Sequence, residues 1–124
     1  EKQLTKRAQK LSILLELNTA GETSKFGASP KEVMKLVKEC SHCRWVKLMG
    51  LMTMGGMVDR AEDNRKNFRL LKNLAQKIAS LKLTNVSMKH LSMGTTRDFA
   101  VAIEEGATIV RIGSAIFDEL VVFS

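Results

Sequence analysis

Short apolar runs and amphipathic stretches alternate along the whole chain. The apolar runs are continuous, as expected for parallel strands that are covered on both faces. Between them, apolar residues recur every three or four positions, which predicts helices. We predict strands at 13–17, 45–52, 86–93 and 108–112, and helices at 30–40, 68–81 and 98–105.

The helix boundaries carry their own signals. Ser29-Pro30-Lys31-Glu32 is a capping box with proline at the first helical position, and Gly106 follows the third predicted helix. Leu4, Ala8 and Leu11 have the spacing of one helical face before the first strand. Residues 115–123 are a last amphipathic segment, which completes a fourth strand–helix pair.

Four strand–helix units in succession predict an α/β fold, half of a TIM-type (β/α)₈ barrel. A complete barrel typically needs roughly 250 residues, and its phosphate site often follows the last two strands. The chain has 124 residues. We therefore expect residues 1–124 to form a single, partial barrel domain.

Two turns follow the last two predicted strands, and each is rich in Gly, Ser and Thr. They are Met93-Gly94-Thr95-Thr96 and Arg111-Ile112-Gly113-Ser114. The start of a helix offers unpaired N–H groups and partial positive charge, which suit a phosphate. Thr95 or Thr96 could cap a helix whose first turn holds Asp98, and capping alone is the alternative interpretation of each turn.

Four ordered motifs resemble the pyridoxal phosphate homeostasis protein family, a single-domain barrel related to the N-terminal domain of alanine racemase. Residues 91–98 resemble the family's L-S-M-G-M-S-x-D, and residues 110–117 its V-R-I-G-[ST]-x-I-F. Upstream, residues 17–27 resemble V-N-x-x-x-E-x-S-K-x-G and residues 50–53 resemble G-L-M-T. The resemblance implies a fold-type III barrel that binds pyridoxal 5′-phosphate (PLP).

The resemblance also implies roles for individual residues. Thr96, Gly113 and Ser114 would bind the cofactor phosphate, and Arg111 would lie beside the pyridine nitrogen. Side chains alternate along a strand, so Arg111 faces the opposite side of the sheet from Val110 and Ile112. A salt bridge at the barrel rim is the alternative interpretation of Arg111. The candidate cofactor-binding residues are Met93, Thr95, Thr96, Arg111, Gly113 and Ser114, although a methionine at a strand end is more often core packing.

The sequence departs from the family pattern in two ways. Thr95 replaces a methionine, and Asp118 replaces the glycine after I-F. The family's V-S-K strand, which carries its Schiff-base lysine, is absent, so no lysine is assigned to the aldehyde. We therefore expect a C-terminal half that holds PLP weakly and non-covalently. The open edges of a half barrel further predict self-association.

Composition narrows the function classes. The sequence is 44% hydrophobic, and its apolar runs are too short to span a bilayer, so a soluble intracellular protein is expected, cytoplasmic or alternatively mitochondrial. The net charge of +7 is spread over the polar faces of successive helices, which favours a solvated surface over a nucleic-acid face.

Other chemistry has weak support. Cys40-Ser41-His42-Cys43 lacks a second ligand pair and follows a helix, where the dipole raises a thiol pKa. His90 lies next to Leu91 on a predicted strand and could be a ligand-facing base, although a structural histidine is the commoner case. The leading hypothesis is a non-catalytic PLP-binding protein of vitamin B6 homeostasis. The alternatives are a fragment of a PLP-dependent racemase-like enzyme and a basic phosphate- or nucleic-acid-binding module.

Overall fold

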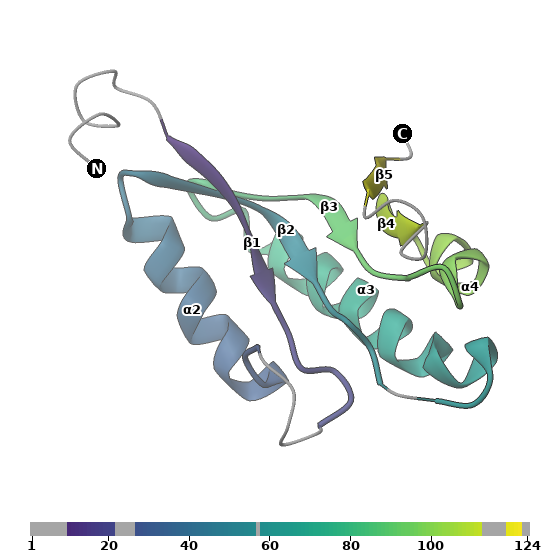
Figure 1. Ribbon diagram of the computed structural model, residues 1–124. Helices are drawn as coiled ribbons and strands as arrows, with labels where there is room; N and C mark the ends of the chain where they lie inside the picture. Colours follow the sequence, from purple (N-terminus) through teal and green to yellow (C-terminus); the bar gives the residue numbers. More distant parts are fainter. Residues whose placement is uncertain (1–9, 22–26, 57, 113–118, 123–124) are drawn as a thin grey trace.

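The fold is that of an α/β half barrel. The computed structural model describes residues 10–21, 27–56, 58–112 and 119–122 (Figure 1). Its strands are β1 (Leu11–Glu16), β2 (Val46–Met52), β3 (Val86–Ser92), β4 (Ile109–Ile112) and β5 (Glu119–Val122). Its helices are α2 (Pro30–His42), the 3₁₀ turn η1 (Ala61–Asn64), α3 (Arg65–Ser80) and α4 (Phe99–Glu104).

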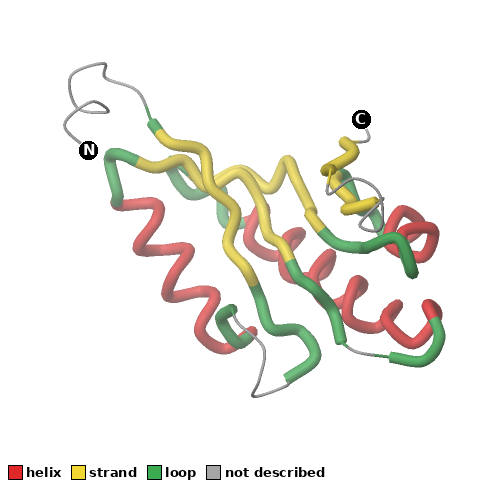
Figure 2. Tube along the Cα trace, viewed as in Figure 1, coloured by secondary structure: helices red, strands yellow, loops and turns green. Residues whose placement is uncertain are grey.

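The strands form one sheet in the order β1-β2-β3-β4-β5. The first four are parallel, and each pairs with the next along the chain. Helices α2, α3 and α4 lie together on one face of this sheet (Figures 1 and 2). This arrangement confirms three of the predicted β/α units and the fourth parallel strand, and it leaves the opposite face of the sheet without a helix in the described part of the chain.

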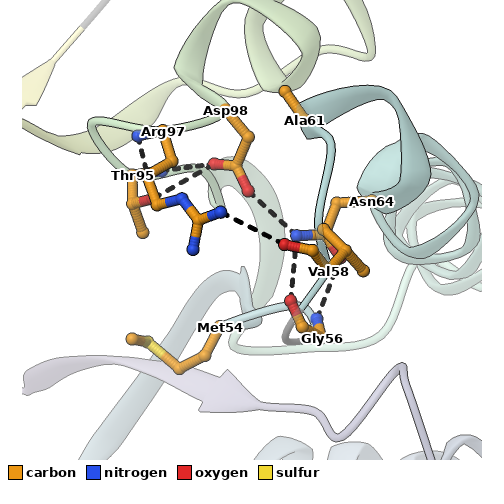
Figure 3. Close-up of a pocket in the computed structure, with 8 residues that line it drawn as sticks. All are labelled: Met54, Gly56, Val58, Ala61, Asn64, Thr95, Arg97 and Asp98. Atoms are coloured by element: carbon orange, nitrogen blue, oxygen red, sulfur yellow. Dashed lines mark hydrogen bonds between the residues drawn. The ribbon is translucent and has the colours of Figure 1, made fainter.

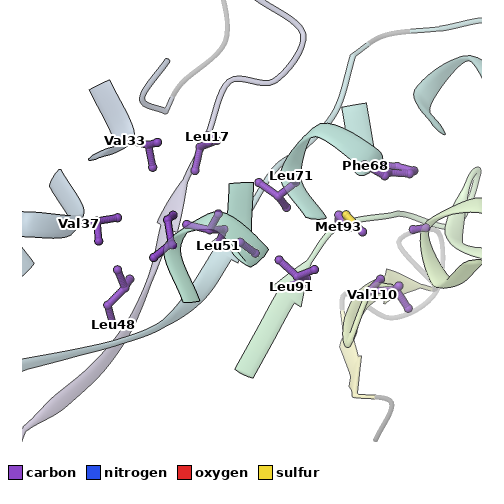
Figure 4. Close-up of a cluster of buried hydrophobic side chains, with 14 residues drawn as sticks. Leu17, Val33, Val37, Leu48, Leu51, Phe68, Leu71, Leu91, Met93 and Val110 are labelled. Atoms are coloured by element: carbon purple, nitrogen blue, oxygen red, sulfur yellow. The ribbon is translucent and has the colours of Figure 1, made fainter. Parts of the chain in front are cut away.

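The hydrophobic core fills the space between the sheet and the helices. Phe68 and Leu71 of α3 are fully buried against Leu51 and Leu91 of the sheet (Figure 4). Val33 and Val37 of α2 continue the core toward β1 and β2. The predicted amphipathic stripe on α3 therefore packs as expected, except that Leu81 at its end is 43% exposed.

The predicted capping box at the start of α2 is confirmed. The Ser29 hydroxyl accepts a hydrogen bond from the Glu32 backbone N–H (3.2 Å), and the Glu32 carboxylate accepts one from the Ser29 N–H (3.0 Å). These hydrogen bonds hold the pKa of Glu32 below its usual range. Helix α2 therefore begins at the residue that the sequence indicated.

Two predicted elements differ from the structure. Leu11 belongs to β1 rather than to a preceding helix, while Leu4 and Ala8 lie outside the described residues. Residues 119–122 form a strand antiparallel to β4, where the last amphipathic segment had been expected to complete a helix. Leu120-Val121-Val122 contains two β-branched residues, and the edge of β4 offers unpaired N–H and C=O groups, so pairing satisfies both.

A network of ion pairs joins α3 to the end of α4. The Arg69 guanidinium donates from Nε and Nη2 to the two Glu105 carboxylate oxygens (3.1 Å each). Arg65 donates to Glu105 (2.6 Å) and to Glu104 (2.5 Å), and it also pairs with Glu62. The hydrogen bonds from Arg69 and then from Arg65 hold the pKa of Glu105 below the usual value of 4.5.

We expect this network to make the free energy of unfolding depend on pH. Because the pKa of Glu105 is lowered in the folded state, its stabilising effect is present above pH 4.5 and is lost as the pH falls through the lowered value. The effect is small, since solvent screens exposed pairs. Wild type should unfold at a higher temperature than Glu105→Gln at about pH 7, and this difference should shrink as the pH falls below the usual value of 4.5. A difference that does not shrink in acid would contradict this expectation.

Candidate functional site

The ends of β3 and β4 lie side by side, held by backbone hydrogen bonds. The Thr108 N–H donates to the Leu91 carbonyl (2.9 Å) and the Met93 N–H to the Ile109 carbonyl (3.0 Å). The Arg111 N–H donates to the Gly94 carbonyl (3.0 Å). The two turns singled out in the sequence therefore leave neighbouring strands at the same edge of the sheet, and the predicted adjacency of their starting points is confirmed. Gly113 and Ser114 lie outside the described residues.

Gly94 allows the first turn to pack closely on α4. Its φ is +102°, a backbone conformation that favours glycine. A Cβ at this position would lie 2.6 Å from the Ala102 Cβ and 3.3 Å from the Val110 Cγ1. The turn can therefore leave β3 and cross directly over the first residues of α4 only with glycine here.

Asp98 shapes the turn that follows Gly94. Its Oδ1 accepts hydrogen bonds from the Thr95 backbone N–H (2.7 Å) and the Thr95 hydroxyl (3.3 Å). Helix α4 begins at Phe99, with Asp98 as the residue before it. The prediction that Thr95 or Thr96 caps a helix containing Asp98 in its first turn is therefore wrong, because the short Asp98 carboxylate binds the backbone N–H three residues earlier.

Asn64 connects this turn to the loop that follows β2 (Figure 3). Its side-chain amide donates to the Asp98 Oδ2 (2.9 Å) and to the Gly56 carbonyl (3.1 Å). Its carbonyl oxygen accepts from the Gly56 N–H (2.9 Å) and from the Asn67 side chain (2.9 Å). Asn64, Asn67 and Asp98 are all buried, so these hydrogen bonds are shielded from water.

A small cavity of about 140 Å³ opens between the two loops. Met54 and Val58 line it from the loop after β2, and Arg97 and Asp98 line it from the turn after β3. The Arg97 guanidinium spans the gap and donates to the Val58 carbonyl (3.2 Å). The two loops are thus joined both at the surface and in the interior.

The described candidate residues occupy different faces of the sheet. Met93 is 2% exposed and belongs to the helix-covered core, which is the alternative stated for it (Figure 4). Val110 is also fully buried in that core, so alternation along β4 directs Ile109 and Arg111 to the helix-free face. Thr96 is exposed and Arg111 half-buried. None of the ion pairs among the described side chains involves Arg111.

Thr53 is a further buried polar residue at this edge of the sheet. Its hydroxyl lies 2.9 Å from the Thr19 hydroxyl and accepts a hydrogen bond from the Gly55 N–H (3.1 Å). In the sequence, the signal that could have identified Thr53 as a site residue is its place as a polar residue at the end of an apolar strand. Asn64 gave no comparable signal, because a polar residue near the start of an amphipathic helix usually faces solvent.

The sequence also singled out Cys40, Cys43 and His90 as candidates for other chemistry. Burial raises the pKa of the Cys40 thiol, and Cys40 and Cys43 are both free thiols. His90 Nδ1 lies 3.3 Å from the Thr108 hydroxyl. Within the described residues, no group of three His, Cys, Asp or Glu side chains is placed to hold a metal ion. No helix in that part of the chain is both long and apolar enough to cross a membrane.

Comparison with known proteins agrees with this architecture. Residues 1–120 match the family described as "Alanine racemase, N-terminal domain". The chain belongs to the alanine racemase N-terminal domain family. Among curated relatives of this family member, the pyridoxal phosphate homeostasis protein of Aquifex aeolicus is 42% identical over 121 residues, covering 94% of this chain and 52% of the relative. The human protein of the same name is 35% identical over 113 residues, covering 90% and 41%.

Solved structures of similar fold extend the comparison. A protein of unknown function from Bifidobacterium adolescentis matches with a TM-score of 0.83 and 34% identity, covering 94% of this chain and 46% of that one. PipY from Synechococcus elongatus, solved with PLP bound, matches with a TM-score of 0.75 and 21% identity, covering 94% and 53%. The second match shows a shared fold. The chain spans about half the length of the curated relatives it matches.

Proposed function

We propose that this family member binds pyridoxal 5′-phosphate at the C-terminal ends of β3 and β4 and serves vitamin B6 homeostasis. The direct backbone pairing of these strand ends carries the proposal, because it places side by side the points where two Gly/Ser/Thr turns begin. The names of the relatives support the choice of ligand. In the proposed role, residues 1–124 form part of a cytoplasmic PLP-binding barrel.

The turns suit the phosphate group of the cofactor. In the proposal Thr96, Gly113 and Ser114 bind it through hydroxyls and backbone N–H groups. Thr95 directly precedes Thr96, and its own N–H is already used by Asp98. Gly94 fits this arrangement, since its conformation keeps the turn close to the end of β4. Contact between Met93 and the cofactor stays a prediction.

Arg111 is proposed to lie beside the pyridine nitrogen. A guanidinium is always charged and cannot accept a proton, so it donates to that nitrogen and keeps it unprotonated. Bound PLP supplies an electron-accepting ring, which is weakened as an electron sink when its nitrogen is unprotonated. A holding role without catalysis therefore suits Arg111 better than a racemase reaction. The proposal includes self-association, because no other strand of the described residues pairs with the outer edge of β1. Within that part of the chain, only the end of the edge is covered, where the Glu16 carbonyl accepts a hydrogen bond from the Ala28 N–H (2.9 Å).

Replacing Arg111 tests this function. We expect Arg111→Ala to bind PLP at least about tenfold more weakly than wild type, since a charge-assisted hydrogen bond is lost. Absorbance or fluorescence titration measures the dissociation constant. Lys89→Ala is the matched control, because it removes one positive charge from an exposed residue of β3.

Two results would count against the proposal. One is PLP binding that is equally strong in Arg111→Ala and in wild type. The other is a PLP–lysine imine that borohydride reduces to a stable amine adduct, because the proposed binding is non-covalent. Equal weakening in Lys89→Ala would show that overall charge, and not the position of Arg111, determines the affinity.

A further inference from the structure

A continuous chain of hydrogen bonds, buried at its centre and partly buried at its ends, runs from the loop after β2 to the turn after β3. It starts at Gly56, passes through the Asn64 side chain to Asp98, and ends at the Thr95 backbone N–H. Each of these four hydrogen bonds measures between 2.7 and 3.1 Å. Asn64 is 3% exposed and Asp98 is 7% exposed.

We propose that Asn64 is a positioning residue that sets the shape of the phosphate-binding turn through Asp98. This inference rests on the proposed function, because it concerns the same turn. Asn64 would not touch the cofactor. It would hold the Asp98 carboxylate in the orientation that fixes Thr95, and so the N–H groups and hydroxyls that follow Thr95 along the turn.

The geometry of Asn64 suits this role because its side chain is held at both ends. Its amide group makes two hydrogen bonds with the backbone of Gly56 and one with Asn67, which leaves one N–H direction for Asp98. Close packing also fixes the Gly56 side, since a Cβ on Gly55 would lie 3.1 Å from Asn64 Oδ1. Asn64 therefore cannot turn without disturbing three other groups.

Asp98 needs such a partner because it carries the charge least suited to a phosphate site. Oδ1 is engaged by Thr95, and Oδ2 by Asn64. Without the Asn64 amide, Oδ2 would lose its buried hydrogen bond, and the carboxylate could rotate to regain one from water. Rotation would release the Thr95 N–H and change the shape of the turn.

The other links between the two loops do not replace this one. The Thr53 N–H bonds the Ser92 carbonyl at the strand ends (3.0 Å), before the turn begins. The Arg97 guanidinium reaches the Val58 carbonyl from an exposed position. Among the described contacts, the Asn64–Asp98 hydrogen bond is the buried one that fixes the turn itself.

The test compares two ligands that differ only in the phosphate. Pyridoxine 5′-phosphate and pyridoxine both lack the aldehyde, so neither forms a lysine adduct. We expect Asn64→Ala in the full chain to weaken binding of pyridoxine 5′-phosphate at least about tenfold, the loss expected when a hydrogen bond to a charged group is removed. Its affinity for pyridoxine should stay within about twofold of wild type. Calorimetric titration measures both.

Asn67→Ala is the matched control for Asn64→Ala. Asn67 is also buried, lies in the first turn of α3 directly after η1 and bonds Asn64, but it contacts neither loop through the hydrogen bonds given above. It should lower the thermal unfolding midpoint while leaving the preference for the phosphorylated ligand unchanged. Asp98→Asn provides a second variant of nearly equal size, which turns one acceptor into a donor facing the Asn64 amide and should reproduce the selective loss.

Selective loss of the phosphorylated ligand in Asn64→Ala or Asp98→Asn supports the inference. Equal loss of both ligands, no loss, or the same selective loss in Asn67→Ala overturns it. A wild-type chain that binds neither ligand overturns the proposed function and this inference together. That failure is distinguishable, because it is seen before any residue is changed.

Discussion

Replacing Gly50 with alanine should prevent β2 and β3 from pairing as they do in the native sheet. Gly50 lies opposite His90 in the register of these strands, and an added Cβ would overlap the backbone carbonyl oxygen of His90. Backbone atoms in a sheet cannot move aside as the end of a flexible side chain can. We expect a loss of at least about 3 kcal/mol in the free energy of unfolding, measured by urea denaturation.

Gly21→Ala is the control for Gly50→Ala. Gly21 has a φ of +72°, but no atom of the described residues lies within 4 Å of the position that an added Cβ would take, so only backbone strain is expected. We expect this variant to lose about 1–2 kcal/mol. If Gly50→Ala were as stable as Gly21→Ala, the close approach of β2 and β3 would be contradicted.

Phe68→Ala should have the next largest effect on stability. Phe68 is fully buried in the core between α3 and the sheet, and truncation removes apolar contacts and leaves a cavity. We expect a loss of about 3–5 kcal/mol in the free energy of unfolding. Phe99→Ala, at a position that is 37% exposed, should lose much less in the same urea experiment. Equal losses would contradict the assignment of Phe68 to the core.

Much of the fold could be predicted because its signals are local. The capping box at Ser29 and Glu32 fixes the start of α2 through contacts three residues apart. Apolar runs marked the parallel strands, although the first strand begins at Leu11, two residues earlier than predicted. The exception at 119–122 is non-local, since that strand depends on the available edge of β4.

The candidate site, like the fold, could be predicted where its signals are local and not where contacts join distant residues. The adjacency of the ends of β3 and β4 followed from the sequence, because consecutive parallel strands end at one edge of the sheet. The link between Asn64 and Asp98 joins residues 34 positions apart, and neither residue type signals its partner. Tertiary packing alone brings them together. It also decided that Asp98, rather than a threonine, precedes α4.

The most direct measurement is a PLP titration of the isotope-labelled chain, followed by backbone amide chemical shifts. If PLP binds through its phosphate where β3 and β4 end, the largest shifts fall on Gly94, Thr95 and Thr96 and on residues 111–114. Asn85, which precedes β3 at the opposite end of the sheet, should stay unchanged. Saturating PLP that leaves residues 94–96 and 111–114 unshifted, or that shifts mainly the opposite end, would contradict the proposed site.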